Sequence, residues 1–501
     1  MTALDVQGLR IAFGRDVVVD DVSFSLDAGE CVAIVGESGA GKSLTARAML
    51  GLVPSDARVT AERWEVAGAD VRRLDERSWR RLRGRTVALV SQDALVSLDP
   101  LQRIGSEVAE PLRLHEKGLR GAALRARVQE ALERVWMPDA GRRARQYPHE
   151  LSGGLRQRAL IASALAASPS VLVADEPTTA LDSTVQARVL DLLREIADAG
   201  TAVLFISHDF AAVRRVADRI LVMRDGRVIE AGPAAQVLDA PREPYTRTLV
   251  AATRHRPRET SAAPGETLLS VDGLAKAFGG VTAVTEATFA VARGRTLGVV
   301  GESGSGKTTL ARMIIGVERP DAGEIRWHGP HRVQFVHQNP LGAFDPRWSI
   351  GRSLREALEA AGVPRGERAE RATALLEEVD LDPALAARRP SALSGGQRQR
   401  AAIARALAAD PDVLVLDEPV SALDPSIRER VLRLLLRLQH ERGLTMLFVS
   451  HDLDVVAAVA EDVLVMQDGA IVEQGPVADV FAAPQHPFTR ELLAAGLSPA
   501  P

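Results

Sequence analysis

Two glycine-rich stretches carry the residues of this 501-residue chain that are best suited to chemistry. Residues 36–43 read Gly-Glu-Ser-Gly-Ala-Gly-Lys-Ser, and residues 301–308 read Gly-Glu-Ser-Gly-Ser-Gly-Lys-Thr. Both fit the pattern G-x-x-x-x-G-K-[S/T], in which backbone N–H groups point inward and form a nest for phosphate oxygens. An apolar run, Thr296–Val300, leads into the second stretch, and a helical pattern follows at Leu310–Ile315. This strand–loop–helix order is the context that the pattern needs.

The residues of these two loops have distinct expected roles. The helix after each loop adds the positive end of its dipole. Lys42 and Lys307 are placed to reach the β- and γ-phosphates of a nucleotide, and Ser43 and Thr308 to ligate Mg²⁺. The expected nucleotide-binding residues are Gly36, Glu37, Ser38, Gly39, Ala40, Gly41, Lys42, Ser43, Gly301, Glu302, Ser303, Gly304, Ser305, Gly306, Lys307 and Thr308. A glycine-rich surface turn is the alternative for one copy alone, and the second copy argues against it.

Lysine usage points to the same loops independently. The chain has 62 lysines and arginines, of which only four are lysines: Lys42, Lys117, Lys276 and Lys307. A compact ammonium fits a crowded phosphate nest, whereas a broad planar guanidinium does not. Two of the four lysines therefore stand where arginine could not replace them.

Acidic pairs recur at matched places in the two halves. Asp175 and Asp417 each end an apolar run that reads as a buried strand, a position from which a carboxylate reaches the Mg²⁺ shell, usually through water. Glu176 and Glu418 follow directly and are placed to orient or deprotonate an attacking water. Two solvated acids at a turn are the alternative interpretation.

Histidines and glutamines also recur in register. His208 and His451 follow a further predicted strand in each half and are expected to contact the γ-phosphate. Gln92 and Gln338 are candidates for ligating Mg²⁺ or positioning water. A lone histidine or a turn glutamine is more often structural, but the duplication favours a functional role.

Aromatic residues and a second glycine motif complete the candidate site. Phe13 and Phe278 each lie 23 residues before a phosphate loop, and we expect them to stack on adenine, with core packing as the alternative. Each half also carries a predicted helix start with free backbone N–H groups, which makes a second anion site. Its residues are Ser152, Gly153 and Gly154 in the first half, and Ser394, Gly395 and Gly396 in the second.

The elements that must position these residues form one duplicated pattern. Alternating strands open each half, at Leu4–Phe13 with Val17–Leu26 and at Leu268–Phe278 with Thr282–Val291. Helical patterns follow at Ala122–Trp136, Arg368–Val379, Ala159–Ala167 and Ala401–Ala409. The first half carries a longer insertion around Val59–Arg83, which reads as surface strands and turns. We expect two α/β domains, residues 1–251 and 267–501, joined by an exposed linker at 252–266.

Composition sets limits on the class of protein. The net charge is −4, so a basic, nucleic-acid-binding domain is not indicated. The single cysteine, Cys31, excludes an intramolecular disulfide and reads as core. The first ten residues do not read as a signal peptide, and the apolar runs are too short to span a membrane. We therefore expect a cytosolic chain whose membrane association comes through a partner.

These residues together resemble the ATP-binding-cassette (ABC) ATPase family, twice over essentially the whole chain. Gln92–Pro100, Tyr147–Gly154 and the Pro-Tyr/Phe-Thr-Arg tails at 244–247 and 487–490 look like the peptide/nickel importer subfamily, whose two ATPase subunits are then fused here. The resemblance implies two tandem P-loop NTPase domains, each with an antiparallel β subdomain and a helical subdomain. It implies ATP and Mg²⁺ as cofactors, and ATP hydrolysis that powers import, first of all of oligopeptides or dipeptides, with nickel, glutathione-like or opine-like solutes as alternatives.

The resemblance also implies partners and a shared site. The expected partners are two membrane permease subunits and an extracytoplasmic solute-binding protein, with the chain held peripherally at the cytoplasmic face of the inner membrane. In the family the two domains close head to tail, so Lys42 is expected to work with Ser394, and Lys307 with Ser152. The segments Ala94–Pro100 and Leu341–Pro346 are expected to face the permeases.

Some residues depart from the subfamily pattern, and two other functions stay open. Leu155 replaces the glutamine that Gln397 keeps, Asp99 and Asp345 stand where asparagine is common, and Ser391-Ala392 replaces His-Glu. A fused sugar-importer ATPase is one alternative, although its second half is often degraded. A tandem-cassette ribosome-associated ATPase is the other, although its linker is usually long, charged and helical.

Overall fold

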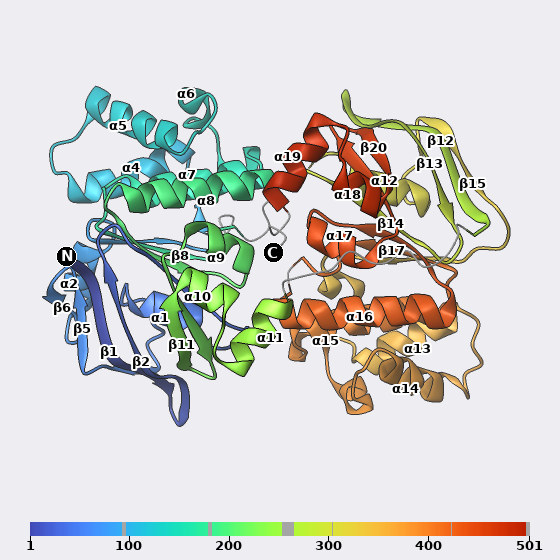
Figure 1. The fold of residues 1–501 in the computed structure, drawn as a ribbon, viewed down its shortest axis with the longest axis horizontal. Helices are drawn as coiled ribbons and strands as arrows, with labels where there is room; N and C mark the ends of the chain where they lie inside the picture. The colour runs from blue at the N-terminus through green and yellow to red at the C-terminus, as the bar shows by residue number, and fades with distance from the viewer. Residues whose placement is uncertain (93–96, 179–182, 253–264, 303, 422, 497–501) are drawn as a thin grey trace. The chain divides into compact units, whose positions relative to one another are not determined.

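The computed structural model describes residues 1–496 except 93–96, 179–182, 253–264, 303 and 422. The chain divides into two compact units: the first covers residues 1–181 and 185–253, and the second covers the rest (Figure 1). Most of the predicted linker lies outside the described residues, so its boundaries stay a prediction. None of the helices within the described ranges is long and apolar enough to cross a membrane.

Each unit is built on a mainly parallel sheet with the same strand order. The first unit has the order β11-β10-β3-β9-β8-β7, and the second contains the order β20-β19-β14-β18-β17-β16. The first-unit strands are β3 (Cys31–Val35), β7 (Val87–Val90), β8 (Val171–Asp175), β9 (Ala202–Ile206), β10 (Arg219–Arg224) and β11 (Arg227–Pro233). The second-unit strands are β14 (Thr296–Gly301), β16 (Val333–Val336), β17 (Val413–Asp417), β18 (Thr445–Val449), β19 (Asp462–Gln467) and β20 (Ala470–Pro476). Among these strands, only the pair at one edge of each sheet is antiparallel: β10 with β11 in the first unit and β19 with β20 in the second.

The central strands are buried because both faces of the sheet are covered. In β3, Cys31, Ala33 and Val35 pack into a core on one face, whereas Val32 and Ile34 pack into a second core on the other. This alternation follows from the period-2 geometry of a strand, and it explains a continuous apolar run with no polar residue. The short, rigid strands hold their carboxyl ends at one edge of the sheet, where the candidate site residues lie.

An antiparallel sheet precedes the phosphate loop in each unit, as predicted. In the first unit β1 (Thr2–Phe13) pairs with β2 (Asp16–Asp27), and β4 (Ala57–Thr60), β5 (Arg63–Val66) and β6 (Ala69–Asp70) extend it. In the second unit β12 (Thr267–Phe278) pairs with β13 (Val281–Ala292) and with β15 (Ala322–Trp327). A bridge between Thr285 and Ala470 joins this second sheet to its parallel neighbour.

The helices cover the sheets and include the four predicted helical runs. The first-unit helices are α1 (Lys42–Ala48), α2 (Glu76–Leu82), α4 (Ile104–His115), α5 (Gly121–Arg134), α6 (Ala140–Arg143), α7 (Gly153–Leu165), α8 (Ser183–Asp198), α9 (Phe210–Val216), α10 (Ala234–Asp239) and α11 (Pro244–Ala252). The second-unit helices are α12 (Lys307–Ile314), α13 (Ile350–Ala360), α14 (Arg368–Glu378), α15 (Gly395–Leu407), α16 (Pro425–Arg442), α17 (Leu453–Val459), α18 (Val477–Ala482) and α19 (Pro487–Gly496).

The insertion around Val59–Arg83 is not made of strands and turns alone. It contains α2, whose first turn is capped by the Asp75 carboxylate accepting from the Ser78 N–H at 2.9 Å. Trp79 is the buried residue of this helix and packs over Gly51, where an added Cβ would lie 2.4 Å from the indole. Arg83 donates to the carbonyl oxygens of Leu50 and Gly51, so the insertion is fastened to the core of its unit.

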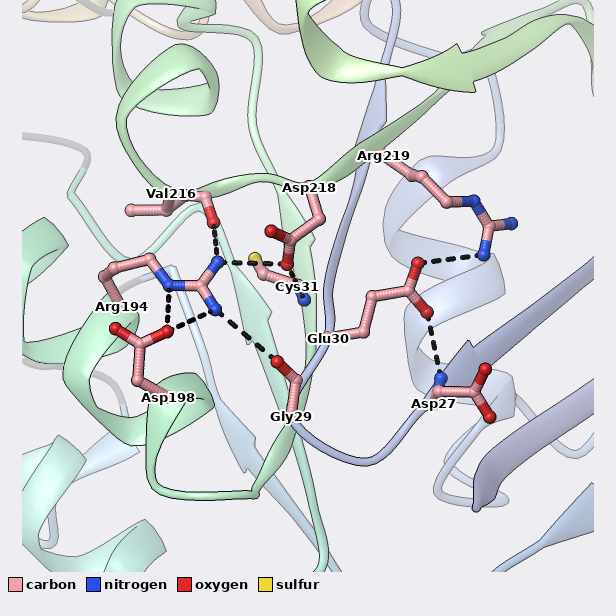
Figure 2. Close-up of polar contacts among 9 residues, drawn as sticks. All are labelled: Asp27, Gly29, Glu30, Cys31, Arg194, Asp198, Val216, Asp218 and Arg219. Carbon is pink, nitrogen blue, oxygen red and sulfur yellow. Dashed lines mark hydrogen bonds and ion pairs between the residues drawn. The ribbon is translucent and has the colours of Figure 1, made fainter.

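Polar contacts fasten the opposite edge of the first sheet, where the strands begin. Figure 2 shows Asp218 accepting from the Cys31 backbone N–H at 2.8 Å and from the Arg194 guanidinium at 3.0 Å. Beside it, Glu30 and Arg219 form an ion pair at 2.9 Å. Cys31 itself is buried and unpaired with another cysteine, and burial raises the pKa of its thiol, which confirms it as a core residue.

Candidate active site

The two phosphate loops follow the central strands β3 and β14 and need glycine where the backbone turns. Gly36 and Gly301 have φ values of 151° and 149°. An added Cβ would lie 2.2 Å from the Met223 carbonyl oxygen in the first unit and 2.1 Å from the Met466 carbonyl oxygen in the second. The glycines therefore let each loop lie directly against the neighbouring strand. Ser303 lies outside the described residues.

The loop lysines fold back over their own loops. Lys42 Nζ donates to the carbonyl oxygens of Gly36 at 2.7 Å and Glu37 at 2.8 Å, and Lys307 makes the matching bonds to Gly301 at 2.8 Å and Glu302 at 2.7 Å. Both lysine side chains are only 6% exposed. A buried ammonium held at the mouth of a nest of backbone N–H groups suits the β- and γ-phosphates of a nucleotide. The described loop residues thus fit the nucleotide that their pattern predicts.

Oxygen ligands meet beside each loop. The Ser43 hydroxyl donates to Asp175 Oδ1 at 2.9 Å, and the Thr308 hydroxyl to Asp417 Oδ1 at 3.2 Å. Burial raises the pKa of both aspartates above the usual value, although the neighbouring hydroxyl and nearby cations act to lower it, so a bound cation would further favour their carboxylate forms. Within the described ranges no cluster of three His, Cys, Asp or Glu side chains could hold a metal alone. This donor set fits Mg²⁺, which takes one or two carboxylates and completes its shell with phosphate and water.

The predicted glutamate, histidine and glutamine come together in both units. His208 Nδ1 lies 3.2 Å from Glu176 Oε1, and Gln92 donates its side-chain N–H to Glu176 Oε2 at 2.8 Å. The second unit repeats this arrangement. His451 lies 3.1 Å from Glu418, and Gln338 donates to Glu418 at 2.8 Å. Each glutamate is thus oriented by a histidine and a glutamine that lie 32 to 84 positions away in the sequence.

The glutamates stand on an unusual backbone that sequence reasoning missed. Glu176 and Glu418 have φ values of 49° and 47°, a region that residues other than glycine seldom adopt. Their backbone N–H groups donate to Ile206 and Val449 in the next strand at 2.9 Å, which holds the conformation in place. Such backbone strain is concentrated at functional sites. No signal in the sequence around the acidic pairs indicates it, because the constraint comes from the neighbouring strand.

The second-unit pair behaves as an ion pair. Burial acts to raise the pKa of Glu418, but the hydrogen bond and charge of His451 and the charge of Lys307 outweigh it, so the pKa is lowered. Burial acts to lower the pKa of His451, but its hydrogen bond with Glu418 raises the pKa above the usual value. Glu418 is therefore held as a carboxylate, the form that can accept a proton from water.

The Ser-Gly-Gly motifs begin α7 and α15, but the two starts are capped differently. Ser394 accepts from the Gln397 N–H at 3.3 Å while the Gln397 side chain accepts from the Ser394 N–H at 3.0 Å, which is a capping box. Ser152 makes no side-chain cap bond, and Leu155 has no group that could complete a box. Among the described contacts, neither serine bonds to a phosphate loop.

The two glycines of each motif have separate roles. A Cβ added at Gly153 would have no neighbour within 4 Å. A Cβ added at Gly395 would have only the Leu423 side chain, at 3.6 Å. An added Cβ at Gly154 would lie 2.7 Å from Val185, and at Gly396 2.3 Å from Ile427. The first glycine of each motif thus leaves open backbone for a ligand, whereas the second lets the next helix pack closely.

The aromatic residues proposed to stack on adenine are not core residues. Phe278 is 46% exposed at the end of β12, with the Lys276 ammonium 5.3 Å from its ring centroid. Phe13 is half-buried at the end of β1. The core-packing alternative is therefore wrong for Phe278, and a role in stacking stays a prediction for both rings.

Two models of known protein families match this chain. The ABC transporter model matches residues 19–179 and 284–421, and the model of the oligopeptide/dipeptide transporter C-terminal region matches residues 229–271 and 472–501. Each model matches the chain twice, in agreement with the predicted duplication, and the match at 229–271 begins in the first unit and extends into the start of the second.

Curated relatives match over nearly their whole length. The peptidoglycan transport ATP-binding protein YejF of Agrobacterium fabrum (strain C58) is 42% identical, covering 99% of this chain and 96% of that protein. The glutathione import ATP-binding protein GsiA of Escherichia coli (strain K12) is 40% identical, covering 98% of this chain and 89% of that protein.

Solved structures share the tandem fold. The archaeal ribosome recycling factor aABCE1, in complex with the stalk protein aP1, superposes with a TM-score of 0.65 at 23% identity, covering 90% of this chain and 86% of that chain. The RNase-L inhibitor gives a TM-score of 0.64 at 22% identity, covering 92% of this chain and 88% of that chain. At these identities the likeness concerns the fold alone. With its two phosphate loops, its paired acids and these relatives, the chain belongs to the ABC transporter family, as a tandem ATPase of the kind that powers importers.

Proposed function

We propose that both units hydrolyse Mg-ATP and that this hydrolysis powers the import of a peptide-containing solute. One observation carries the proposal: the same lysine, hydroxyl, aspartate, glutamate, histidine and glutamine meet at the carboxyl edge of both sheets. Their contacts agree between units within a few tenths of an ångström. Neither half has lost a catalytic group, so neither unit is degraded.

Each residue type has a separate role at each site. Lys42 and Lys307, whose ammonium groups now donate to their own loops, would bind phosphate oxygens, and Asp175 and Asp417 would hold the metal with the neighbouring hydroxyl. Bound Mg²⁺ supplies positive charge to the phosphate oxygens. The catalytic glutamate accepts a proton from the attacking water, while its histidine and glutamine partners keep it aimed.

The substrate class follows from the relatives. The relatives are named for the transport of peptidoglycan, which carries peptide stems, and the import of glutathione, which is a tripeptide. A match to the oligopeptide/dipeptide transporter region adds to this. We therefore place short peptides and peptide conjugates ahead of nickel or opine-like solutes.

The partners and location follow from the same reasoning. We infer two membrane permease subunits and an extracytoplasmic solute-binding protein, with the chain held peripherally at the cytoplasmic face of the inner membrane. Residues 97–100 and 341–346 are the described parts of the proposed permease-facing segments. Leu341, in the second segment, is 43% exposed, and Leu101, directly after the first segment, is 84% exposed. The rest of the first segment, residues 94–96, lies outside the described residues.

Each active site is proposed to be shared between the units. Ser152 would complete the site of Lys307, and Ser394 that of Lys42. In a background carrying Glu176→Gln and Glu418→Gln, occluded ATP can be counted per protein. Ser152→Arg and Lys307→Ala should each remove the same nucleotide, and their combination should remove no more. If Ser152→Arg emptied the Lys42 site instead, the shared arrangement would be wrong.

Transport and location test the whole proposal. The purified chain with its permeases in vesicles should take up labelled di- or tripeptide in an ATP-dependent manner, and Glu176→Gln with Glu418→Gln should abolish uptake while ATP still binds. Stoichiometric sedimentation with ribosomes in the presence of ATP, without copurifying permeases, would contradict it.

A further inference from the structure

The Pro-Tyr-Thr-Arg tail at the start of α11 has no part in the proposed chemistry, yet it is firmly anchored. Glu230, 8% exposed in β11, accepts from the backbone N–H groups of Arg242 at 2.9 Å and Glu243 at 3.1 Å. The second unit repeats this clamp with Glu473, which accepts from Gln485 at 2.8 Å and His486 at 3.0 Å. A carboxylate that binds two successive N–H groups fixes the first turn of the following helix. The residue after the proline is therefore held in a defined place.

In the first unit that residue is Tyr245, and it reaches the phosphate loop. The Glu37 backbone N–H donates to the Tyr245 hydroxyl at 3.3 Å. The Arg224 guanidinium lies 4.8 Å from the centre of the tyrosine ring and supports it from β10. Glu37, like Gly36, has a carbonyl oxygen that accepts from Lys42. The hydroxyl thus contacts the same peptide segment that holds the phosphate-binding ammonium.

The second unit lacks this connection. Phe488 stands where Tyr245 does, carries no hydroxyl and is a core residue that is 6% exposed. Gln467 stands where Arg224 does, so the cation over the ring is also missing. Gly36 and Gly301 lie against Met223 and Met466 in the same way. The second loop has its own further contacts through Ser305, whose carbonyl oxygen accepts from the Gly469 N–H at 3.2 Å and whose hydroxyl accepts from Lys307 at 3.5 Å. One support of the loop is therefore specific to the first unit.

We propose that Tyr245 is a positioning residue for the first phosphate loop, and that it makes nucleotide binding at this loop depend on the C-terminal helix of its unit. The second loop has no such dependence. This inference rests on the proposed nucleotide binding, and it adds a difference between two sites whose catalytic groups are alike.

The test measures ADP binding at one loop at a time. ADP with Mg²⁺ is titrated calorimetrically into Lys307→Ala protein, which leaves the first loop intact, and into Lys42→Ala protein, which leaves the second. Tyr245→Phe keeps the ring and removes the hydroxyl. It should weaken binding at the first loop by about two- to fivefold, the effect of one long neutral hydrogen bond, and leave the second loop unchanged. In steady-state ATP hydrolysis, KM should rise more than kcat falls.

Other outcomes would overturn the inference. Unchanged ADP binding in Tyr245→Phe, or equal weakening at both loops, would do so. A loss in Tyr245→Leu without a loss in Tyr245→Phe would assign the effect to ring packing and not to the hydroxyl. If neither parent protein binds ADP, the proposed function fails and this inference fails with it.

Discussion

The two edges of each parallel sheet differ in how closely the units agree. At the carboxyl edge, Glu176 with His208 and Glu418 with His451 have the same residue types at distances of 3.2 and 3.1 Å. At the opposite edge the charges are exchanged. Glu30 pairs with Arg219 in the first unit, but the matching pair in the second is Arg295 with Asp462, at 3.3 Å.

Other contacts at the opposite edge keep their geometry and change their residues. The first backbone N–H of the central strand donates to Asp218 in one unit and to Glu461 in the other, at 2.8 and 2.7 Å. The Gly29 carbonyl accepts from Arg194 at 3.5 Å, and the Gly294 carbonyl from Gln439 at 2.9 Å. This edge needs only complementary charge and satisfied backbone groups, whereas the carboxyl edge needs particular chemical groups.

The strongest test of this contrast concerns the catalytic glutamates. Glu176→Gln and Glu418→Gln should each lower turnover at their own site by about 10²–10⁴-fold, because the general base is lost. Single-turnover hydrolysis of labelled ATP should show half of the burst amplitude in each single variant and almost none in the double variant. A full burst in one variant and none in the other would show that the carboxyl edges of the two units are not equivalent.

The His451–Glu418 ion pair should make stability depend on pH. Glu418, whose pKa is lowered, contributes stability above its unfolded value of 4.5, and His451, whose pKa is raised, contributes below its unfolded value of 6.5. His451→Gln should therefore cost about 1.5–3 kcal/mol of second-unit stability between these two values. The cost should shrink as the pH rises through the folded pKa of His451.

Urea unfolding of the ligand-free protein at pH 5.5 and pH 9 would measure this. The double variant Glu418→Gln/His451→Gln is the matched control, because with both partners neutral it should lose the pH dependence of this pair. A His451→Gln cost that is equal at both pH values would contradict the ion pair.

The opposite edge should tolerate a charge exchange. Arg219→Asp places two acids together and should cost the first unit about 1 kcal/mol, since the pair is partly exposed. Glu30→Arg combined with Arg219→Asp copies the arrangement of the second unit and should recover part of that loss in a double-mutant cycle. No recovery in urea unfolding would mean that this edge is as specific as the carboxyl edge.

The smallest expected effect concerns the helix caps. Ser394→Ala should destabilise the second unit by about 1 kcal/mol, because it removes a capping box. Ser152→Ala should cost less, since that hydroxyl makes no cap bond. Leu155→Gln should stabilise the first unit by several tenths of a kcal/mol if it builds the missing box. Equal costs for both serine variants in thermal unfolding would argue against the capping difference.

The parts of the fold that could be predicted are those whose signal is local. The phosphate loops, the buried strands and the acids at their ends follow from runs of five to eight residues. Helix α4 was missed although Ile104, Val108 and Leu112 recur at four-residue spacing, because Pro111 obscures the pattern. Helix α2 was missed because its apolar positions are few among arginines.

The remaining features depend on partners that are distant in the sequence. The backbone of Glu176 is held by Ile206, and the tail of Tyr245 is held by Glu230. The ion pair of Glu30 with Arg219, whose charges are exchanged in the second unit, becomes visible only when β3 and β10 are known to lie side by side. A single sequence shows the residues but not these pairings. The catalytic residue types could therefore be predicted, and the supports that aim them could not.

The scarcity of lysine has a practical consequence for chemical labelling. The two loop lysines are 6% exposed, whereas Lys117 lies on the surface and the Lys276 side chain is 15% exposed in its ion pair with Asp321. An amine-reactive reagent would thus have few targets besides the amino terminus. Slow acylation at Lys42 and Lys307, read by mass spectrometry against Lys117 as an internal standard, would report loop opening separately for the two halves without any mutation or added fluorophore.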